Sequence, residues 1–292
     1  MRIFALALLC VLLGACVHRP QKIDRPEVPA NLSSDVSYKS VTALTYEPAE
    51  VKLAYGEGPL QYGLLWLPEH ERPGEPAPLV IFVHGGCWLN VYDINHSNAF
   101  SSALSQAGYA VWSIEYRRSG DVGGGWPGSL NDVLRGISFA QSFNDYPIDL
   151  TQVVITGHSA GGHLALLAGA ADKHAFVNGN AVKAVVGLAA ISDIGTYSLG
   201  DNSCQTAVSQ FMGGDYSDNS DDYQQATPNV RSLPGRSLLL QGDGDNIVPV
   251  SQASNSQFEH LIVPGAGHFD WIHPQTHAFK LFLLQLEALF NQ

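Results

Sequence analysis

Basic residues are scarce in this sequence of 292 residues, in which 15 Lys and Arg stand against 27 Asp and Glu for a formal net charge of −12. Because an acidic surface repels phosphate backbones, nucleic acid is not an expected partner. No internal repeat and no sustained heptad pattern is present, which argues against a solenoid or a coiled coil. The histidines lack the His-Glu-x-x-His spacing of a zinc site, and we expect neither a metal nor another cofactor.

Long apolar runs are also missing, apart from "MRIFALALLCVLLGAC" at the start of the chain. This run is too short to cross a bilayer comfortably as a mature helix, and the Arg before it is typical of a secretory signal peptide, predicted here at residues 1–15. "LGAC" resembles the bacterial lipoprotein box, which would make Cys16 the lipidated N-terminus. Because Val17 follows rather than Asp, the resemblance implies a lipid anchor in the outer membrane, with the protein in the cell envelope and facing the periplasm.

Only four cysteines occur, and Cys10 would leave with the signal peptide. Cys87 and Cys204 would then share a compartment in which disulfides can persist. Their separation along the chain gives no geometry, so one bridge and two separate thiols both remain open. Residues 16–40 are polar and rich in proline, and we expect them to form a tether before the folded domain at residues 41–292.

Short apolar runs alternate with stretches of helical periodicity along that domain. Its runs of Val, Ile and Leu are typical of buried strands covered on both faces. Strands that alternate with helices predict an α/β domain with a mostly parallel, doubly wound sheet. The strands are expected at residues 62–68, 78–86, 109–117, 152–159, 182–190, 236–245 and 260–268, and the helices at residues 99–108, 130–143, 160–171 and 276–290.

Residues 194–233 break this rhythm, because they are polar, rich in turn formers and too long for a passive connection. Ligands of such folds bind at the carboxyl edge of the sheet. We therefore expect a lid-like insertion over that edge.

The stretch "GHSAGG", residues 157–162, places Ser159 between a predicted strand and a predicted helix. Small flanking residues allow a strained turn that exposes the hydroxyl, and the helix starting at Ala160 directs its N–H groups and dipole toward developing negative charge. Gly-x-Ser-x-Gly alone is a weak signal, but in this context it predicts a nucleophile.

A serine hydroxyl needs an adjacent base, and in such folds the acid and then the histidine follow the serine in sequence. His268 follows the last predicted strand, at the edge that carries Ser159. Asp243 and Asp245 both follow the preceding predicted strand, and Asp193 follows the strand before that. We expect His268 to be the base, with the acid among these three carboxylates.

The oxyanion of such a reaction needs N–H donors. The run "VIFVHGGCW" ends a predicted strand in two glycines, which let the backbone turn its amides inward. We expect the amides of Gly86, Cys87 and Ala160 to form an oxyanion hole, with His84 as a hydrogen-bonding brace. Trp88 and Trp126 are candidates for the walls of the substrate pocket, because indoles supply flat apolar surfaces.

From about residue 45 to the end, the sequence resembles the α/β-hydrolase superfamily, on the motifs "HGGCW", "GHSAGGHLALLAG", "FMGG", "DGDNIVP" and "GAGHFDW". Within it the chain is similar to the hormone-sensitive-lipase-like esterases and to the branch of feruloyl and acetyl-xylan esterase-like and kynurenine formamidase-like proteins. The stretch "DNIVP" resembles one common in the superfamily and implies Asp245 as the acid. The resemblance also implies that Arg117 and Asp132 brace the site from behind. Cys87 is a departure, because lipase-like relatives often have a third glycine there.

These observations predict a serine esterase that cleaves carboxylic esters of short-chain or aromatic acids through an acyl-enzyme. The motifs also fit an amidase of the arylformamidase type, although that role is cytosolic and a lipoprotein signal argues against it. A non-catalytic envelope binding protein is the alternative from another class. The sequence identifies neither the acyl group nor the alcohol, and it does not predict the oligomeric state.

Overall fold

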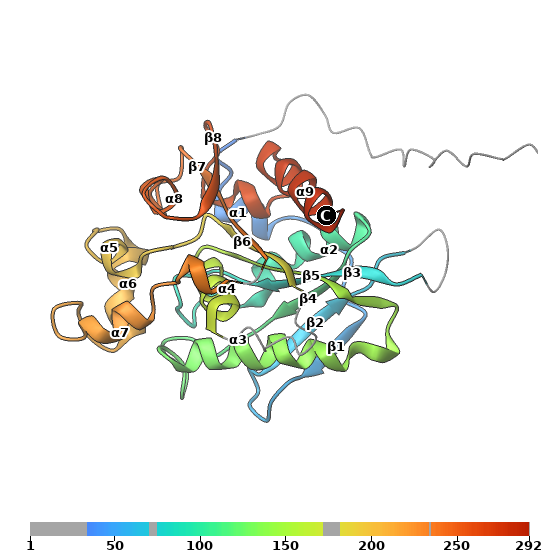
Figure 1. Cartoon of the computed structure of the whole chain (residues 1–292), viewed down its shortest axis with the longest axis horizontal. Helices are drawn as coiled ribbons and strands as arrows, with labels where there is room; N and C mark the ends of the chain where they lie inside the picture. Colours follow the sequence, from blue (N-terminus) through green and yellow to red (C-terminus); the bar gives the residue numbers. More distant parts are fainter. Residues whose placement is uncertain (1–33, 70–74, 172–181, 234, 292) are drawn as a thin grey trace, which may run out of the picture. The chain divides into compact units, whose positions relative to one another are not determined.

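The computed structural model describes residues 34–69, 75–171, 182–233 and 235–291. The signal peptide, Cys16 and most of the expected tether lie outside these residues. One sheet of eight strands runs through the domain in the order β1-β2-β4-β3-β5-β6-β7-β8 (Figure 1). The strands are β1 (Val51–Ala54), β2 (Tyr62–Trp66), β3 (Ala77–Val83), β4 (Ala110–Ile114), β5 (Ile148–His158), β6 (Val182–Leu188), β7 (Arg236–Gly242) and β8 (Glu259–Val263).

Six neighbouring strands, from β4 to β8 across the sheet, are parallel, and β2 and β1 continue the sheet in antiparallel pairing. The prediction of a mostly parallel, doubly wound sheet is therefore confirmed. The sequence did not reveal β1, because this edge strand alternates half-buried and exposed residues and lacks the apolar run of a central strand.

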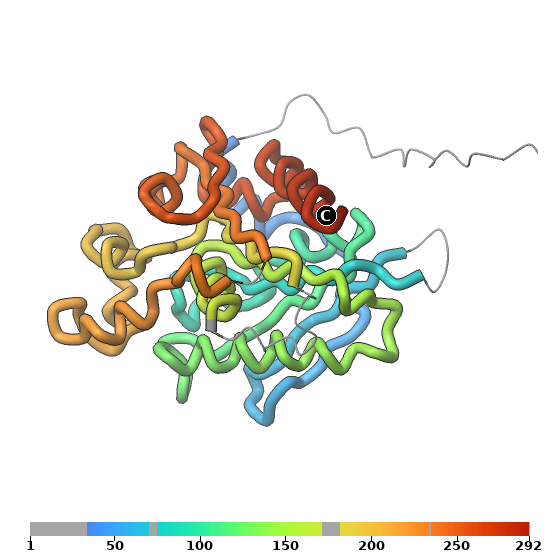
Figure 2. The backbone as a smooth tube through the Cα atoms, in the orientation of Figure 1, coloured from blue at the N-terminus to red at the C-terminus, as the bar shows by residue number. Residues whose placement is uncertain are grey.

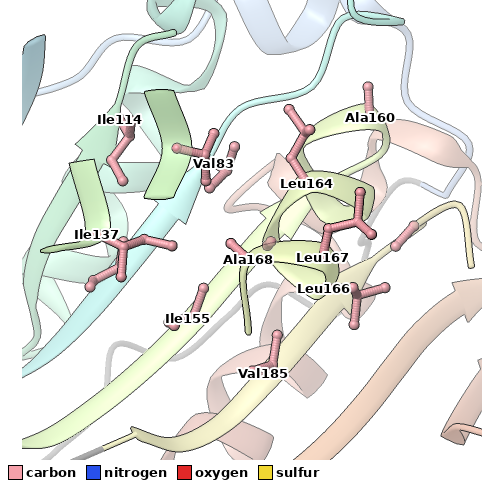
Figure 3. Packing of buried hydrophobic residues seen from close by; sticks show 14 of the residues in the cluster. Val83, Ile114, Ile137, Ile155, Ala160, Leu164, Leu166, Leu167, Ala168 and Val185 are labelled. Atoms are coloured by element: carbon pink, nitrogen blue, oxygen red, sulfur yellow. The ribbon is translucent and has the colours of Figure 1, made fainter. Parts of the chain in front are cut away.

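Helices cover both faces of the sheet, as Figures 1 and 2 show. α3 (Gly128–Phe139) and α4 (Ala160–Ala171) pack on one face, and α2 (Asn98–Gln106) and α9 (His277–Phe290) pack on the other. Successive residues of β3 alternate between the two cores, because side chains of a strand point to opposite faces. Figure 3 shows the first core, where Leu164 and Ala168 of α4 lie in one cluster with Ile155 of β5 and Ile137 of α3.

The region between β6 and β7 contains α5 (Ile194–Tyr197), α6 (Ser203–Met212) and α7 (Ser220–Gln225), followed by a 3-10 turn at Val230–Ser232. The polar stretch 194–233 is thus a set of short helices rather than a loop. A disulfide joins Cys204 of α6 to Cys87, with 4.9 Å between the Cα atoms. The sequence left this pairing open, because 117 positions separate the two cysteines.

The N-terminal helix α1 (Tyr38–Thr42) begins before the boundary expected at residue 41. The backbone N–H groups of Asp35 and Val36 donate to the carboxylate of Asp270, at 2.9 and 2.8 Å, and the N–H of Gly267 donates to it at 3.0 Å. The chain therefore joins the domain at residue 35, some residues earlier than expected. Within the described segments, no helix is long and apolar enough to cross a membrane.

We expect Asp270→Asn to lower the free energy of unfolding by about 2–3 kcal/mol. The buried carboxylate accepts three backbone hydrogen bonds, and an amide NH2 group would face at least one of those N–H donors. Chemical denaturation measures the loss. Asp243→Asn is the matched control, since the exposed Asp243 accepts one bond from Gly265 and should cost less than about 1 kcal/mol. Equal losses in the two variants would contradict the role of Asp270 as the anchor of the N-terminal segment.

Candidate active site

Ser159 occupies the turn between β5 and α4. Its φ is +55°, in the left-handed region that residues with a side chain rarely adopt. The glycines that flank the turn make it possible, because neither position has room for a side chain. A Cβ on Gly157 would lie 2.3 Å from the carbonyl oxygen of Gly161. A Cβ on Gly161 would lie 2.2 Å from the carbonyl oxygens of Val83 and His84. The amino end of α4 is thereby held against the carboxyl ends of β5 and β3, as the sequence predicted for a nucleophile turn.

Asp245 and His268 meet at the same edge of the sheet. Nδ1 of His268 lies 2.8 Å from Oδ2 of Asp245, and both side chains are buried. The other carboxylate oxygen accepts the N–H groups of Ile247 and Val248, each at 2.8 Å. An ionised carboxylate only accepts hydrogen bonds, so Nδ1 of His268 carries the hydrogen and Nε2 is left as the basic nitrogen.

His158 holds His268 in place, a role the sequence did not indicate. Its Nε2 donates to the backbone carbonyl oxygen of His268 at 2.9 Å, and the two ring centroids are 4.6 Å apart. Burial lowers the pKa of His158 well below its usual value, and the nearby His268 lowers it further. His158 is therefore neutral at pH 7. Because it directly precedes Ser159 in the chain, its hydrogen bond connects the nucleophile turn with the loop that carries the candidate base.

The loop after β3, residues 84–88, lies against Ser159. A Cβ on Gly85 would lie 2.8 Å from the carbonyl oxygen of His158 and 3.2 Å from Cβ of Ser159. Gly86 has a φ of +118° and Cys87 a φ of +52°. Within the described part of the chain, the amides of these two residues donate no hydrogen bond. Half-buried free N–H groups next to a candidate nucleophile are suited to bind an oxyanion.

A buried network supports this loop from behind. His84 Nε2 lies 3.0 Å from Oε1 of Glu115, and Nη1 of Arg118 lies 3.0 Å from the same oxygen. Burial alone would raise the pKa of Glu115, but the charge and hydrogen bond of His84 and the charge of Arg118 together lower it. Next to this network, Arg117 forms a two-point ion pair with Asp132, with both contacts at 2.7 Å. His84, Glu115 and Arg118 thus support the loop after β3, and the ion pair of Arg117 with Asp132 lies beside them.

The two alternative acids have other partners. Asp193 caps α5 by accepting the N–H of Thr196 at 3.0 Å, and Asp243 is exposed and accepts the N–H of Gly265 at 2.6 Å. Of the three carboxylates considered, the structure brings Asp245 to His268. The sequence offered no physical reason for this choice, because Asp243 and Asp245 follow the same strand.

The expectation that Trp88 forms a wall of the pocket is wrong. Its side chain is fully buried and stacks on Phe211 of α6, with ring centroids 5.0 Å apart. The reason lies in the backbone, because φ values of +52° at Cys87 and +58° at Trp88 turn the indole into the core beneath the loop. Trp126 is half-buried, and its backbone N–H donates to the carbonyl oxygen of Phe211 at 2.8 Å.

A groove of about 910 Å³ opens between α5, α7 and the short helix α8 (Ser251–Ser254), and Asp193 is one of its lining residues. Hydroxyl and amide side chains predominate on its walls, and one of them, Gln252, accepts the backbone N–H groups of Ser192 and Asp193. Ser159 and His268 do not line it. Among the described residues, no group of three or more His, Cys, Asp or Glu side chains could hold a metal ion.

We expect Ser159→Ala and Asp245→Asn each to lower kcat for an ester by at least about 1,000-fold, since the first removes the nucleophile and the second the partner that fixes the His268 tautomer. Asp193→Asn is the control and should change kcat less than about 3-fold, because that carboxylate caps a helix. Rates with p-nitrophenyl acetate and labelling by a fluorophosphonate, which should modify Ser159 alone, provide the measurements. A larger loss in Asp193→Asn than in Asp245→Asn would assign the acid to Asp193.

Comparison with known proteins gives the family. The model of the BD-FAE family matches residues 65–259. The chain is 30% identical over 268 residues to Esterase LipC of Mycobacterium tuberculosis, covering 80% of this chain and 64% of LipC. It is 29% identical over 212 residues to Esterase LipQ of the same organism, covering 69% of this chain and 50% of LipQ. The chain thus spans less than two thirds of the length of these curated relatives.

Solved structures agree on the fold. A truncated carbohydrate esterase from gut microbiota superposes with a TM-score of 0.69 at 22% identity, covering 89% of this chain and 100% of that chain. Esterase B from Lactobacillus rhamnosis superposes with a TM-score of 0.68 at 23% identity, covering 87% and 91%. The domain therefore has the α/β-hydrolase fold expected from the sequence. Since the family model covers more than half of the residues, this chain belongs to the BD-FAE family.

Proposed function

We propose that this protein is a serine hydrolase that cleaves carboxylic esters, with Ser159, His268 and Asp245 as its catalytic residues. The observation that carries the proposal is the 2.8 Å bond from Nδ1 of His268 to Asp245, at the edge of the sheet where Ser159 lies in a turn with a left-handed φ. The named esterases among the relatives support the same reaction.

In the proposed reaction, Nε2 of His268 takes the hydroxyl proton as Ser159 Oγ attacks the ester carbonyl carbon. Asp245 stabilises the imidazolium that results, and the amides of Gly86, Cys87 and Ala160 bind the oxyanion. His268 then gives its proton to the leaving alcohol, and an acyl-enzyme remains. Water, deprotonated by the same nitrogen, attacks the acyl carbon and releases the acid, which restores the serine hydroxyl.

For the substrate, we propose esters of short-chain or aromatic acids. Trp126 is half-buried on a glycine-rich loop next to α6, and an indole there would restrict the acyl pocket and supply a flat apolar wall. An arylformamidase-type amidase uses the same residues and is the second candidate. A non-catalytic binding protein would have no need of a basic His268 nitrogen fixed by a buried carboxylate.

We expect kcat/KM for p-nitrophenyl esters to fall by at least about 100-fold from butyrate to palmitate, because a restricted pocket rejects a long chain. N-formylkynurenine, assayed in parallel, should be turned over more slowly than butyrate. Trp126→Ala should flatten the dependence on chain length, and the exposed Tyr46→Ala is the control. Rapid turnover of palmitate by the wild type would refute the short-chain preference, and faster turnover of N-formylkynurenine would favour the amidase.

For the location, we propose a lipid-anchored protein of the bacterial cell envelope, held in the outer membrane and facing the periplasm. The lipoprotein-like stretch ending at Cys16 supports this location. The Cys87–Cys204 disulfide adds support, because such bonds persist in oxidising compartments.

We expect the wild type to incorporate a labelled fatty acid during growth and Cys16→Ser to incorporate none, because the thiol of Cys16 would carry the lipid. Gel fluorography of the immunoprecipitated protein measures the label, and membrane fractionation reports the location. Cys10→Ser is the matched control and should be labelled like the wild type. A labelled Cys16→Ser protein, or an unlabelled wild type, would show that "LGAC" is a chance match.

A further inference from the structure

The β3 loop, residues 84–88, has a backbone conformation that its own residues do not favour. Cys87 and Trp88 are consecutive residues with side chains, and both have a left-handed φ, +52° and +58°. Residues with a side chain are strained in this conformation, and they persist there only where the surroundings impose it. Something outside the loop must therefore hold it.

Helix α6 makes the contacts that do so. Cys204, in its first turn, forms the disulfide with Cys87, and Phe211, in its last turn, stacks on Trp88 at 5.0 Å. Each of the two strained residues thus has a partner on α6.

The helix is itself fixed to the loop that carries the candidate acid. Asn202 caps α6 through a reciprocal pair of bonds with Gln205, and its side-chain amide donates to the carbonyl oxygen of Ile247 at 2.9 Å. The N–H of Ile247 donates to Asp245 at 2.8 Å. One helix of the insertion is therefore bonded both to the loop with the free amides and to the loop with the carboxylate.

We propose that Cys204 is a positioning residue, and that its disulfide to Cys87 holds the Cys87 amide in the geometry that binds the oxyanion. The proposal rests on the esterase function proposed above, and it makes catalysis dependent on the redox state of this one bond. Because the amide acts on the transition state, loosening it should lower kcat and leave substrate binding largely unchanged.

The redox step balances with a small dithiol as the reductant. The dithiol gives two electrons and two protons, its own sulfurs close into a disulfide, and Cys87 and Cys204 become thiols. Cys87 is half-buried and so within reach of the reagent. Removal of the dithiol and addition of oxidised glutathione should re-form the bond and restore the rate.

In the test, wild-type enzyme is assayed with p-nitrophenyl acetate before reduction, after reduction with dithiothreitol and after reoxidation. We expect reduction to lower kcat by about 10- to 100-fold, less than the roughly 100- to 1,000-fold that loss of a whole oxyanion donor costs, with KM changed less than about 2-fold. The rate of inactivation by a p-nitrophenyl phosphonate should fall in parallel with kcat, because its phosphoryl oxygen occupies the same hole.

Two variants complete the design. Cys204→Ser should have the kcat of the reduced wild type and no further response to dithiothreitol. Thr206→Ala, at an exposed position of the same helix, should behave as the wild type in every assay. Circular dichroism below the unfolding transition confirms that the reduced protein and Cys204→Ser are folded, which separates positioning from stability.

Unchanged kcat in folded, reduced wild type would overturn this proposal and leave the esterase function intact. A loss confined to KM would also overturn it. If the unreduced wild type hydrolyses no ester, the failure belongs to the proposed function instead.

Discussion

The site depends on how closely α4 approaches the ends of β3 and β5. The room left at Gly157 and Gly161 is smaller than a methyl group, since a Cβ at either position would lie within 2.3 Å of a carbonyl oxygen. This contact forces the chain to turn at Ser159 with a left-handed φ. The remaining parts of the site, the His268 loop, the β3 loop and the Asp245 loop, are held around that turn by buried hydrogen bonds and one disulfide.

Much of this arrangement could be predicted from the sequence, for a physical reason. The central strands are continuous apolar runs, and parallel strands bring their carboxyl ends to one edge, so Ser159 and His268 could be assigned to the same edge from the pattern alone. The choice of Asp245 over Asp243 needed a resemblance, since both follow one strand and only side-chain direction distinguishes them.

The features that the sequence missed depend on packing between segments far apart in the chain. A half-exposed edge strand such as β1 has no apolar run, and an indole such as Trp88 is equally suited to a pocket wall and to a core. His158 gave no sign of its contact with His268, 110 positions away. The insertion was expected as a cover, and the contacts of its helix α6 with Cys87 and Trp88 of the β3 loop are ones that a polar composition does not reveal.

The attachment of the N-terminal segment has a practical consequence for choosing domain ends. A recombinant fragment starting at residue 41, where the composition changes, would lack two of the three backbone N–H groups that donate hydrogen bonds to a buried carboxylate. That carboxylate, on Asp270, is two positions from His268 and in the same 3-10 turn. Trimming residues that look dispensable in the sequence would therefore disturb the surroundings of the candidate base, so a fragment meant for assay should begin before Asp35.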